Sequence, residues 1–341
     1  MHCCAECFGD RGLRKDLIPA SPGATGDCAY CGTMGVRVVL PQVLAEYFQL
    51  VVGAYVPDAS GETLAHLLRK NWRLFQHPAM DNARATALLQ EILEGFDVAG
   101  SRFREPPPDA DRLSDWERLR DELRSRNRFF PDANLDLDRL GNLLDAIKIE
   151  ADEVPDVWYR ARTQTDDVPF GIDRMGPPPS RIASHGRANP PGIPYLYLGS
   201  TPHTAIAEIR PHTGELICVA DFTTPNDLRL VDLREPRKVL SPFVLGDTSD
   251  VVKLMADLPF LERLGDELTR PVLPQMAAID YTPSQYLCEF IKKRKYDGVL
   301  YRSSVSAGIN LALFDAARAT PGAVVQYRAA RVSVDVETVL P

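Results

Sequence analysis

The sequence predicts an α+β protein in which a small cysteine-rich segment and an all-α part precede a mixed β domain. Five of the seven cysteines lie within the first 31 residues. From residue 41 apolar residues recur at helical spacing, and from about residue 155 short runs rich in β-branched and aromatic residues replace that pattern. We therefore expect three domains, over 1–36, 37–150 and 151–341.

The composition is that of an ordinary globular protein, with 45% hydrophobic and 25% charged residues in 341. A net charge of -8 argues against sequence-independent binding to DNA or RNA. No apolar run reaches the roughly 18 residues of a membrane span. The first residues, MHCCAECFGD, have neither the basic nor the apolar region of a secretion signal. We expect a cytoplasmic protein with no membrane contact and no nucleic-acid partner.

The cysteines near the N-terminus form two C-x2-C pairs, Cys4 with Cys7 and Cys28 with Cys31. In a reducing compartment such a set is more typical of metal binding than of disulfides. Each pair places two sulfurs on one turn, and two turns can complete a tetrahedron with Zn–S bonds of about 2.3 Å. The spacing predicts a zinc knuckle over 1–36, with His2 or Cys3 as substitutes for one ligand of the first pair. Four protein ligands leave no open position, so the Zn²⁺ would be structural.

The region from 37 to 150 is expected to be helical. Amphipathic runs are PQVLAEYFQLVVGAYV, GETLAHLLRKNWRLFQH and NARATALLQEILEGF, and the prolines of REPPPDAD end this series. Ser114 and Glu117 have the spacing of a capping box that would open DWERLRDELRSRN. LDLDRLGNLLDAIKI is the last helical run. We expect these helices to be a scaffold for contacts with the C-terminal domain, a partner or a second copy.

The region after 155 carries five strand-like runs, VWYRAR, YLYL, ELICVADF, LRLVDL and GVLYRS, with a helical insertion over 241–275. After YLYL, Thr201 and Pro202 have the residue types of an N-cap and a first helical position. The helix that they predict carries Glu208. Its carboxylate would lie either in solvent or in a pocket beside Tyr197. A second helix is expected from Thr282.

Four segments in order, WYRAR, GRANPPGIPYLYL, STPHTAIAEI and YDGVLYRSS, resemble the RES domain, which is named for its Arg, Glu and Ser. The resemblance covers about residues 155 to 320. It implies a fold similar to that of ADP-ribosyltransferases. It also implies an enzyme, typically a toxin, that consumes NAD+ by cleaving the nicotinamide–ribose bond as a glycohydrolase or phosphorylase.

The resemblance also implies roles for individual residues. Glu208 would stabilise the positive charge that develops on the ribose. Arg160 and Arg187 would bind the pyrophosphate, because a guanidinium forms paired hydrogen bonds with such oxygens. Structural alternatives remain open: Arg160 as an ion-pair partner and Arg187 as a cap of the Gly-Asn turn.

Three further residues complete the expected site. Tyr197 would stack on nicotinamide or ribose, unless it is an ordinary core aromatic. Ser303 would donate a hydrogen bond to the substrate, and Ser304 is a nearly equal candidate for substrate contact. Neither serine is expected to be a covalent nucleophile, because no histidine and acid accompany them.

A toxic activity requires control, so an antitoxin or other regulatory protein, a trigger or self-association is expected. One alternative is an ADP-ribosyltransferase that modifies a protein or nucleic acid through the same site. An alternative of another class is a zinc-dependent binding or adaptor protein with an inactive RES fold. The acceptor, the partner, the oligomeric state and the role of the helical domain stay open at the level of sequence.

Overall fold

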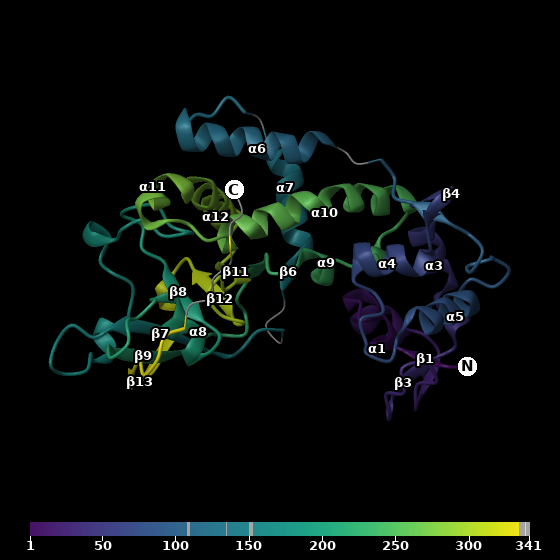
Figure 1. Cartoon of the computed structure of the whole chain (residues 1–341), viewed down its shortest axis with the longest axis horizontal. Coiled ribbons are helices and arrows are strands. Elements are labelled where there is room, and N and C mark those ends of the chain that lie inside the picture. Colours follow the sequence, from purple (N-terminus) through teal and green to yellow (C-terminus); the bar gives the residue numbers. More distant parts are fainter. Residues whose placement is uncertain (108–109, 134, 150–152, 334–337, 339–341) are drawn as a thin grey trace. The chain divides into compact units, whose positions relative to one another are not determined.

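The computed structural model describes residues 1–107, 110–133, 135–149, 153–333 and 338 (Figure 1). The chain divides into two compact units, residues 1–114 with 235–262, and residues 115–234 with 263–341. The expected three-domain division stays a prediction. Its boundary at 150–151 lies outside the described residues, as do Pro108 and Asp109 of REPPPDAD. Among the described helices, none combines the length and the apolar character that crossing a membrane requires.

The first unit combines short helices with two small antiparallel sheets, β1-β3-β2 and β4-β5. Its helical character was expected, but the pairing of β4 with β5 was not. Buried phenylalanine rings form its centre, and the ring of Phe48 lies 5.5 Å from that of Phe8 and 4.6 Å from that of Phe243. Its elements are β1 (Cys3–Cys4), α1 (Ala5–Phe8), η1 (Leu13–Leu17), α2 (Ile18–Ala20), β2 (Gly23–Gly26), β3 (Val36–Val39), η2 (Pro41–Leu44), α3 (Ala45–Val52), β4 (Val56–Glu62), α4 (Leu64–Trp72), α5 (Asn82–Ile92), β5 (Phe103–Arg104), α9 (Pro236–Val239) and η6 (Pro242–Val244).

Two long helices, α6 (Ala110–Ser125) and α10 (Thr248–Thr269), contain unit boundaries, and most of α6 belongs to the second unit. The helical insertion expected over 241–275 is confirmed by α10. The capping box expected at Ser114 is wrong, because α6 begins at Ala110 and Ser114 lies inside it. Helix formers before Ser114 extend the helix toward the N-terminus, so this serine has no helix start to cap.

The second unit is built on a mixed sheet of eight strands in the order β13-β9-β7-β8-β12-β11-β10-β6. Neighbours are antiparallel except for β10 and β11, which are parallel. The α+β fold class is confirmed. The elements are α7 (Leu137–Ala146), β6 (Lys148–Ile149), β7 (Val157–Thr163), η4 (Ile172–Arg174), η5 (Ser180–Ile182), β8 (Leu196–Gly199), α8 (Pro202–Glu208), β9 (Leu216–Thr223), β10 (Leu230–Asp232), η7 (Pro274–Met276), α11 (Ala277–Asp280), α12 (Thr282–Lys293), β11 (Gly298–Arg302), β12 (Ile309–Leu313), η8 (Ala316–Arg318) and β13 (Thr320–Arg328).

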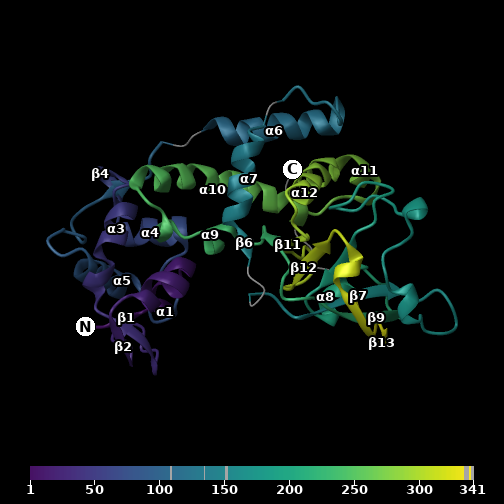
Figure 2. The same ribbon diagram turned by 180° about the vertical axis from the view of Figure 1, so that it is seen from behind.

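Both faces of this sheet are covered. On one face Trp158, Leu198 and Leu311 belong to a large apolar core. On the other, Ala161 of β7 and Val219 of β9 pack with Ala205 of α8, and Figure 2 shows α8 beside β7.

The turn from β8 into α8 is compact, and it fixes where Glu208 lies. The side chain of Thr201 accepts a hydrogen bond from the backbone N–H of Thr204, and Pro202 follows, as the sequence predicted. Gly199 permits this approach, because a Cβ on it would lie 2.8 Å from the backbone nitrogen of Ala205.

Gly199→Ala should therefore displace α8 and destabilise the protein by roughly 1–3 kcal/mol, the usual cost of overpacking. The measurement is the thermal unfolding midpoint. Gly176→Ala is the matched control, because a Cβ there meets no atom within 4 Å. Equal midpoints for the two variants would contradict the tight β8–α8 packing.

Candidate functional site

A cavity of about 360 Å³ lies in the second unit beside β7, β8 and α8. Four of the six residues expected to act on the substrate line it, namely Arg160, Arg187, Tyr197 and Glu208. Ser303 and Ser304 are not in its lining, but each is hydrogen-bonded to a residue that is. The remaining lining residues are Tyr159, Ala161, His185, Gly186, Leu198, Gly199, Ala205, Ile209, Tyr281, Tyr301 and Asn310.

The cavity opens where β7 and β8 part. These neighbours in the sheet are paired at a single position, Tyr159 with Gly199. The side chain of Arg160 extends toward β8, where one guanidinium nitrogen donates a 3.2 Å hydrogen bond to the backbone oxygen of Tyr197. The Arg160 side chain thus donates to a carbonyl that would accept from a backbone N–H if β7 and β8 were paired over a longer stretch.

Within the described part of the chain, Arg160 is a half-buried cation without a carboxylate counter-ion. Among the described residues it forms no ion pair with a carboxylate, and its Nε has no hydrogen-bond partner. Burial, reinforced by the nearby charge of Arg162, lowers its pKa to about 10. It therefore remains charged at neutral pH, and an anion in the cavity would offset its desolvation. The structural alternative of an ion-pair partner finds no support in these contacts.

Glu208 lies at the end of α8 with its carboxylate anchored by two side chains. Ser303 Oγ donates to Oε1 at 2.7 Å, and Asn310 Nδ2 donates to the same oxygen at 2.6 Å. Ser303 and Asn310 are both buried. Among the described residues nothing donates to Oε2, so one carboxylate oxygen is fixed and the other can accept a hydrogen bond from a ligand.

Arg187 is held by contacts from three directions. Its guanidinium donates to the backbone oxygen of Arg270 at 2.6 Å and to Oγ of Ser304 at 3.3 Å. It also lies 5.4 Å from the ring centre of Tyr281. Its own backbone oxygen accepts a 2.6 Å hydrogen bond from Ser284. The two neighbouring serines therefore serve different groups, Ser303 the carboxylate and Ser304 the guanidinium.

The hydroxyl of Tyr197 holds the turn that carries Arg187. It donates to Oδ1 of Asn189 at 2.7 Å and accepts from the backbone N–H of Ala188 at 3.0 Å. Burial raises the pKa of this hydroxyl, so it stays protonated. The turn needs glycine at 186, because a Cβ there would lie 2.5 Å from the tyrosine oxygen. The ring lines the cavity while the hydroxyl is engaged in the turn.

Sequence reasoning missed two residues that this site uses. Asn310 interrupts the apolar run of β12, and a buried amide in such a strand was a signal that could have been followed. Tyr281 precedes α12, where nothing in the sequence distinguishes it from a packing residue.

A separate candidate metal centre lies in the first unit, where both C-x2-C pairs converge. The sulfurs of Cys4, Cys7, Cys28 and Cys31 all lie within 4.8 Å of one another and are buried. The Cys4–Cys31 and Cys7–Cys28 sulfur distances are 3.5 and 3.3 Å. Tetrahedral bonds of about 2.3 Å would separate the sulfurs by about 3.8 Å, so the cluster is of the right size for Zn²⁺.

The thiol chemistry of this cluster also favours a cation. Hydrogen bonds from Cys4 and Cys7 lower the pKa of the Cys28 thiol, whereas hydrogen bonds with Cys28 and Cys4 raise that of Cys7. The four buried sulfurs cannot all be thiolates unless a cation compensates their charge. Cys3 is buried but is not part of the cluster. Cys218 and Cys288 are buried core residues of the second unit.

Purified protein should therefore contain about one zinc per chain, and Cys28→Ser should contain much less, because a four-thiolate site loses affinity with one ligand missing. Elemental analysis measures both. Cys3→Ser is the control and should retain its zinc. Loss of zinc from the Cys3 variant would instead indicate that Cys3 replaces Cys4 or Cys7 as a ligand. Chelation should also lower the unfolding midpoint.

Comparisons with known proteins bear on the second unit. The RES domain family matches residues 157–335, a range that begins at the first residue of β7. Among solved structures, a chain of the M. tuberculosis MbcT–MbcA toxin–antitoxin complex is similar to this one at 17% sequence identity, over 56% of this chain and 93% of that chain, with a TM-score of 0.33. No curated protein matches the chain. The family match extends over more than half of the sequence, so the chain belongs to the RES domain family, as the four segments around Arg160, Arg187, Glu208 and Ser303 predicted.

Proposed function

We propose that this protein is an NAD+-consuming toxin that cleaves the bond between nicotinamide and ribose. The observation that carries the proposal is that one cavity holds an anchored carboxylate, Glu208, together with two arginines, Arg160 and Arg187. Its volume of about 360 Å³ is near the lower end for small-molecule pockets. It would enclose the reacting end of a dinucleotide rather than the whole molecule.

Glu208 supplies what bond cleavage requires. When nicotinamide leaves as a neutral molecule, the ribose carbon acquires positive charge, and a carboxylate nearby stabilises it. Because Ser303 and Asn310 hold Oε1 before any substrate arrives, little reorganisation is needed during the reaction. Oε2 is then available to a ribose hydroxyl. In this scheme Ser303 acts as a positioning residue for Glu208.

The arginines supply the charge that binds the pyrophosphate. Arg160 is half-buried and has no carboxylate partner among the described residues, a condition in which an anionic ligand gains much from a guanidinium. Arg187 reaches the same cavity from the turn after residue 185. The ring of Tyr197 would pack against nicotinamide or ribose, while its hydroxyl keeps that turn in place.

The acceptor of the ADP-ribosyl group is water or phosphate in this proposal, and a protein or nucleic-acid acceptor would use the same site. The zinc centre is structural. An activity that depletes NAD+ would be held in check by an antitoxin, another regulatory protein or self-association, in the cytoplasm of the host cell.

Glu208→Gln should reduce nicotinamide release from NAD+ by about a hundredfold or more, because it removes the charge that stabilises the transition state. Glutamine keeps an oxygen that can accept from Ser303 and Asn310, so the fold should be retained. The assay follows nicotinamide by chromatography, with water, phosphate and labelled protein acceptors in parallel.

Glu289→Gln is the matched control, since Glu289 is an exposed acid on α12 away from the cavity lining. It should release nicotinamide at the rate of the native protein. Equal rates for the Glu208 and Glu289 variants would refute the assignment, and no turnover with any acceptor would support the inactive-fold alternative.

Arg160→Met should raise the KM for NAD+ about tenfold or more, as expected for loss of a charge-assisted hydrogen bond of roughly 1.5–3 kcal/mol. The unfolding midpoint should stay equal or rise, because removing the desolvated charge offsets the lost bond to Tyr197. Arg162→Met, on the same strand but exposed, should leave both quantities unchanged. A midpoint that falls sharply with unchanged KM would mean that Arg160 is only structural.

A further inference from the structure

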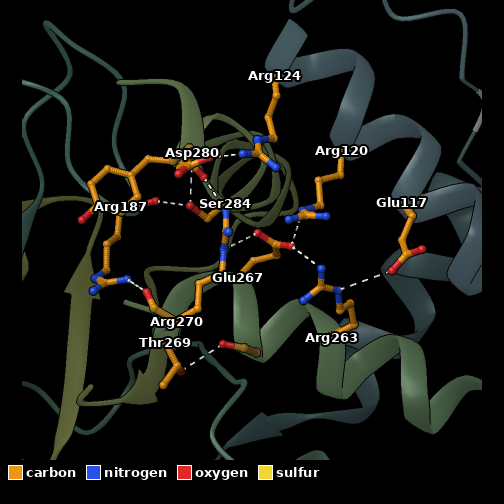
Figure 3. A network of polar contacts seen from close by, with 12 residues as sticks. Glu117, Arg120, Arg124, Arg187, Arg263, Glu267, Thr269, Arg270, Asp280 and Ser284 are labelled. Carbon is orange, nitrogen blue, oxygen red and sulfur yellow. Dashed lines mark hydrogen bonds and ion pairs between the residues drawn. The ribbon is translucent and has the colours of Figure 1, made fainter. Parts of the chain in front are cut away.

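Outside the cavity lining, the second unit contains a fully buried carboxylate, Glu267, among three arginines (Figure 3). Charged atoms of Arg120, Arg270 and Arg263 approach its two oxygens to 2.9, 3.1 and 3.5 Å. These are ion pairs between charges rather than aligned hydrogen bonds. A carboxylate at such depth is stable only because these cations compensate it, so removing one of them disturbs the others.

Arg120 comes from α6, which lies outside the range that matches the RES family. Among the α6 residues whose burial is described, Trp116, Leu119 and Leu123 are buried and lie at helical spacing. One turn beyond Arg120, Arg124 forms an ion pair with Asp280 at the end of α11. The helix is therefore attached to the rest of the second unit by an apolar stripe and two half-buried arginines.

The same network reaches Arg187. The backbone oxygen of Arg270 is the acceptor for the Arg187 guanidinium, and the Arg270 side chain donates to the backbone oxygen of Asp280 at 2.9 Å (Figure 3). Arg270 directly follows the last residue of α10. Carbonyl groups at a helix C-terminus have no intrahelical hydrogen-bond partner. The position of the Arg270 carbonyl therefore depends on the contacts of the Arg270 side chain. Those contacts are with Glu267 on one side and Asp280 on the other.

We propose that α6 is a positioning element of the active site, acting through Arg120, Glu267 and Arg270 to aim the guanidinium of Arg187 into the cavity. The proposal rests on the proposed function, in which Arg187 binds the pyrophosphate of NAD+. Loss of Arg120 leaves Glu267 with less compensating charge and loosens the end of α10. The Arg270 carbonyl then shifts, and with it the direction of Arg187. Small displacements of a binding group reduce its contribution steeply.

We call this series of contacts, from Arg120 through Glu267 and Arg270 to Arg187, the relay. Steady-state kinetics of Arg120→Leu in the full chain test it. The KM for NAD+ should rise about fivefold to tenfold while kcat stays within about twofold, because substrate binding and not the Glu208 chemistry is affected. Arg118→Leu is the matched control: Arg118 lies on the same helix, is 70% exposed, and forms an ion pair with Asp115 and with no other described residue. Its KM should not change. Arg120→Lys, which keeps the charge, should restore much of the native KM and covers the case in which the leucine variant fails to fold.

A double variant separates a relay from a general loss of stability. In a protein that already carries Arg187→Ala, adding Arg120→Leu should leave the KM unchanged, because the group on which it acts is absent. Additive effects of the two substitutions would overturn the proposal. So would a KM for Arg120→Leu equal to that of the Arg118 control in an enzyme whose native form turns over NAD+.

Hydrogen exchange gives a reading that does not depend on turnover. The amide of Gly186 donates to the Asn189 oxygen, and that of Ala188 donates to the Tyr197 hydroxyl. Both should exchange faster in Arg120→Leu than in Arg118→Leu. If the native protein consumed no NAD+, the proposed function would fail, and equal exchange in these two variants would still decide against the relay from α6.

Discussion

The site depends on one constraint in the sheet, the separation of β7 from β8 after a single paired position at Tyr159 and Gly199. Where two central strands part, their backbone groups need other partners, and the gap becomes a place where side chains from both strands meet. The Arg160 guanidinium takes the place of one missing ladder bond at the Tyr197 carbonyl. Continuous pairing of β7 with β8 would close the cavity, leaving Glu208 and Arg187 with no common space. The apolar cores on both faces keep the strands in place despite the gap.

Around this gap, charged groups are held before a ligand binds, and they are held by different parts of the chain. Ser303 and Ser304 are adjacent in sequence, yet one donates to Glu208 and the other accepts from Arg187. A single segment at the end of β11 thus holds both the carboxylate and the Arg187 guanidinium of the cavity. Arg160 differs from Glu208 and Arg187, because its half-buried charge meets no carboxylate in the described part of the chain. Under the proposed function, the cation and the carboxylate with one free oxygen would face a ligand that carries both charges, as NAD+ does with its pyrophosphate and its nicotinamide cation.

Local signals allowed much of this arrangement to be predicted. Thr201 and Pro202 specify where α8 begins, so the placement of Glu208 about two helical turns into α8 follows from capping and helix geometry. The converging cysteine pairs follow from spacing alone. Long-range contacts were not accessible in this way. Asn310 and Glu208 are 102 residues apart, and nothing local states that β12 lies beside β8. The burial of Glu267 was hidden for the same reason, since its compensating Arg120 comes from a distant helix. At Ser114 a local motif misled, because helix propensity upstream outweighed the cap.

The interleaving of the two units has a consequence for the newly synthesised protein. The first unit is completed only by residues 235–262, and the second only by residues after 263, so neither can close around its core while the ribosome is still making the middle of the chain. Ser303 and Asn310, which donate hydrogen bonds to Glu208, are synthesised after both arginines that are expected to bind the substrate. A nascent chain would therefore present its acid unsupported until β11 and β12 have left the ribosome. Under the proposed function, the order of synthesis would delay NAD+ cleavage until the carboxylate of Glu208 has been anchored.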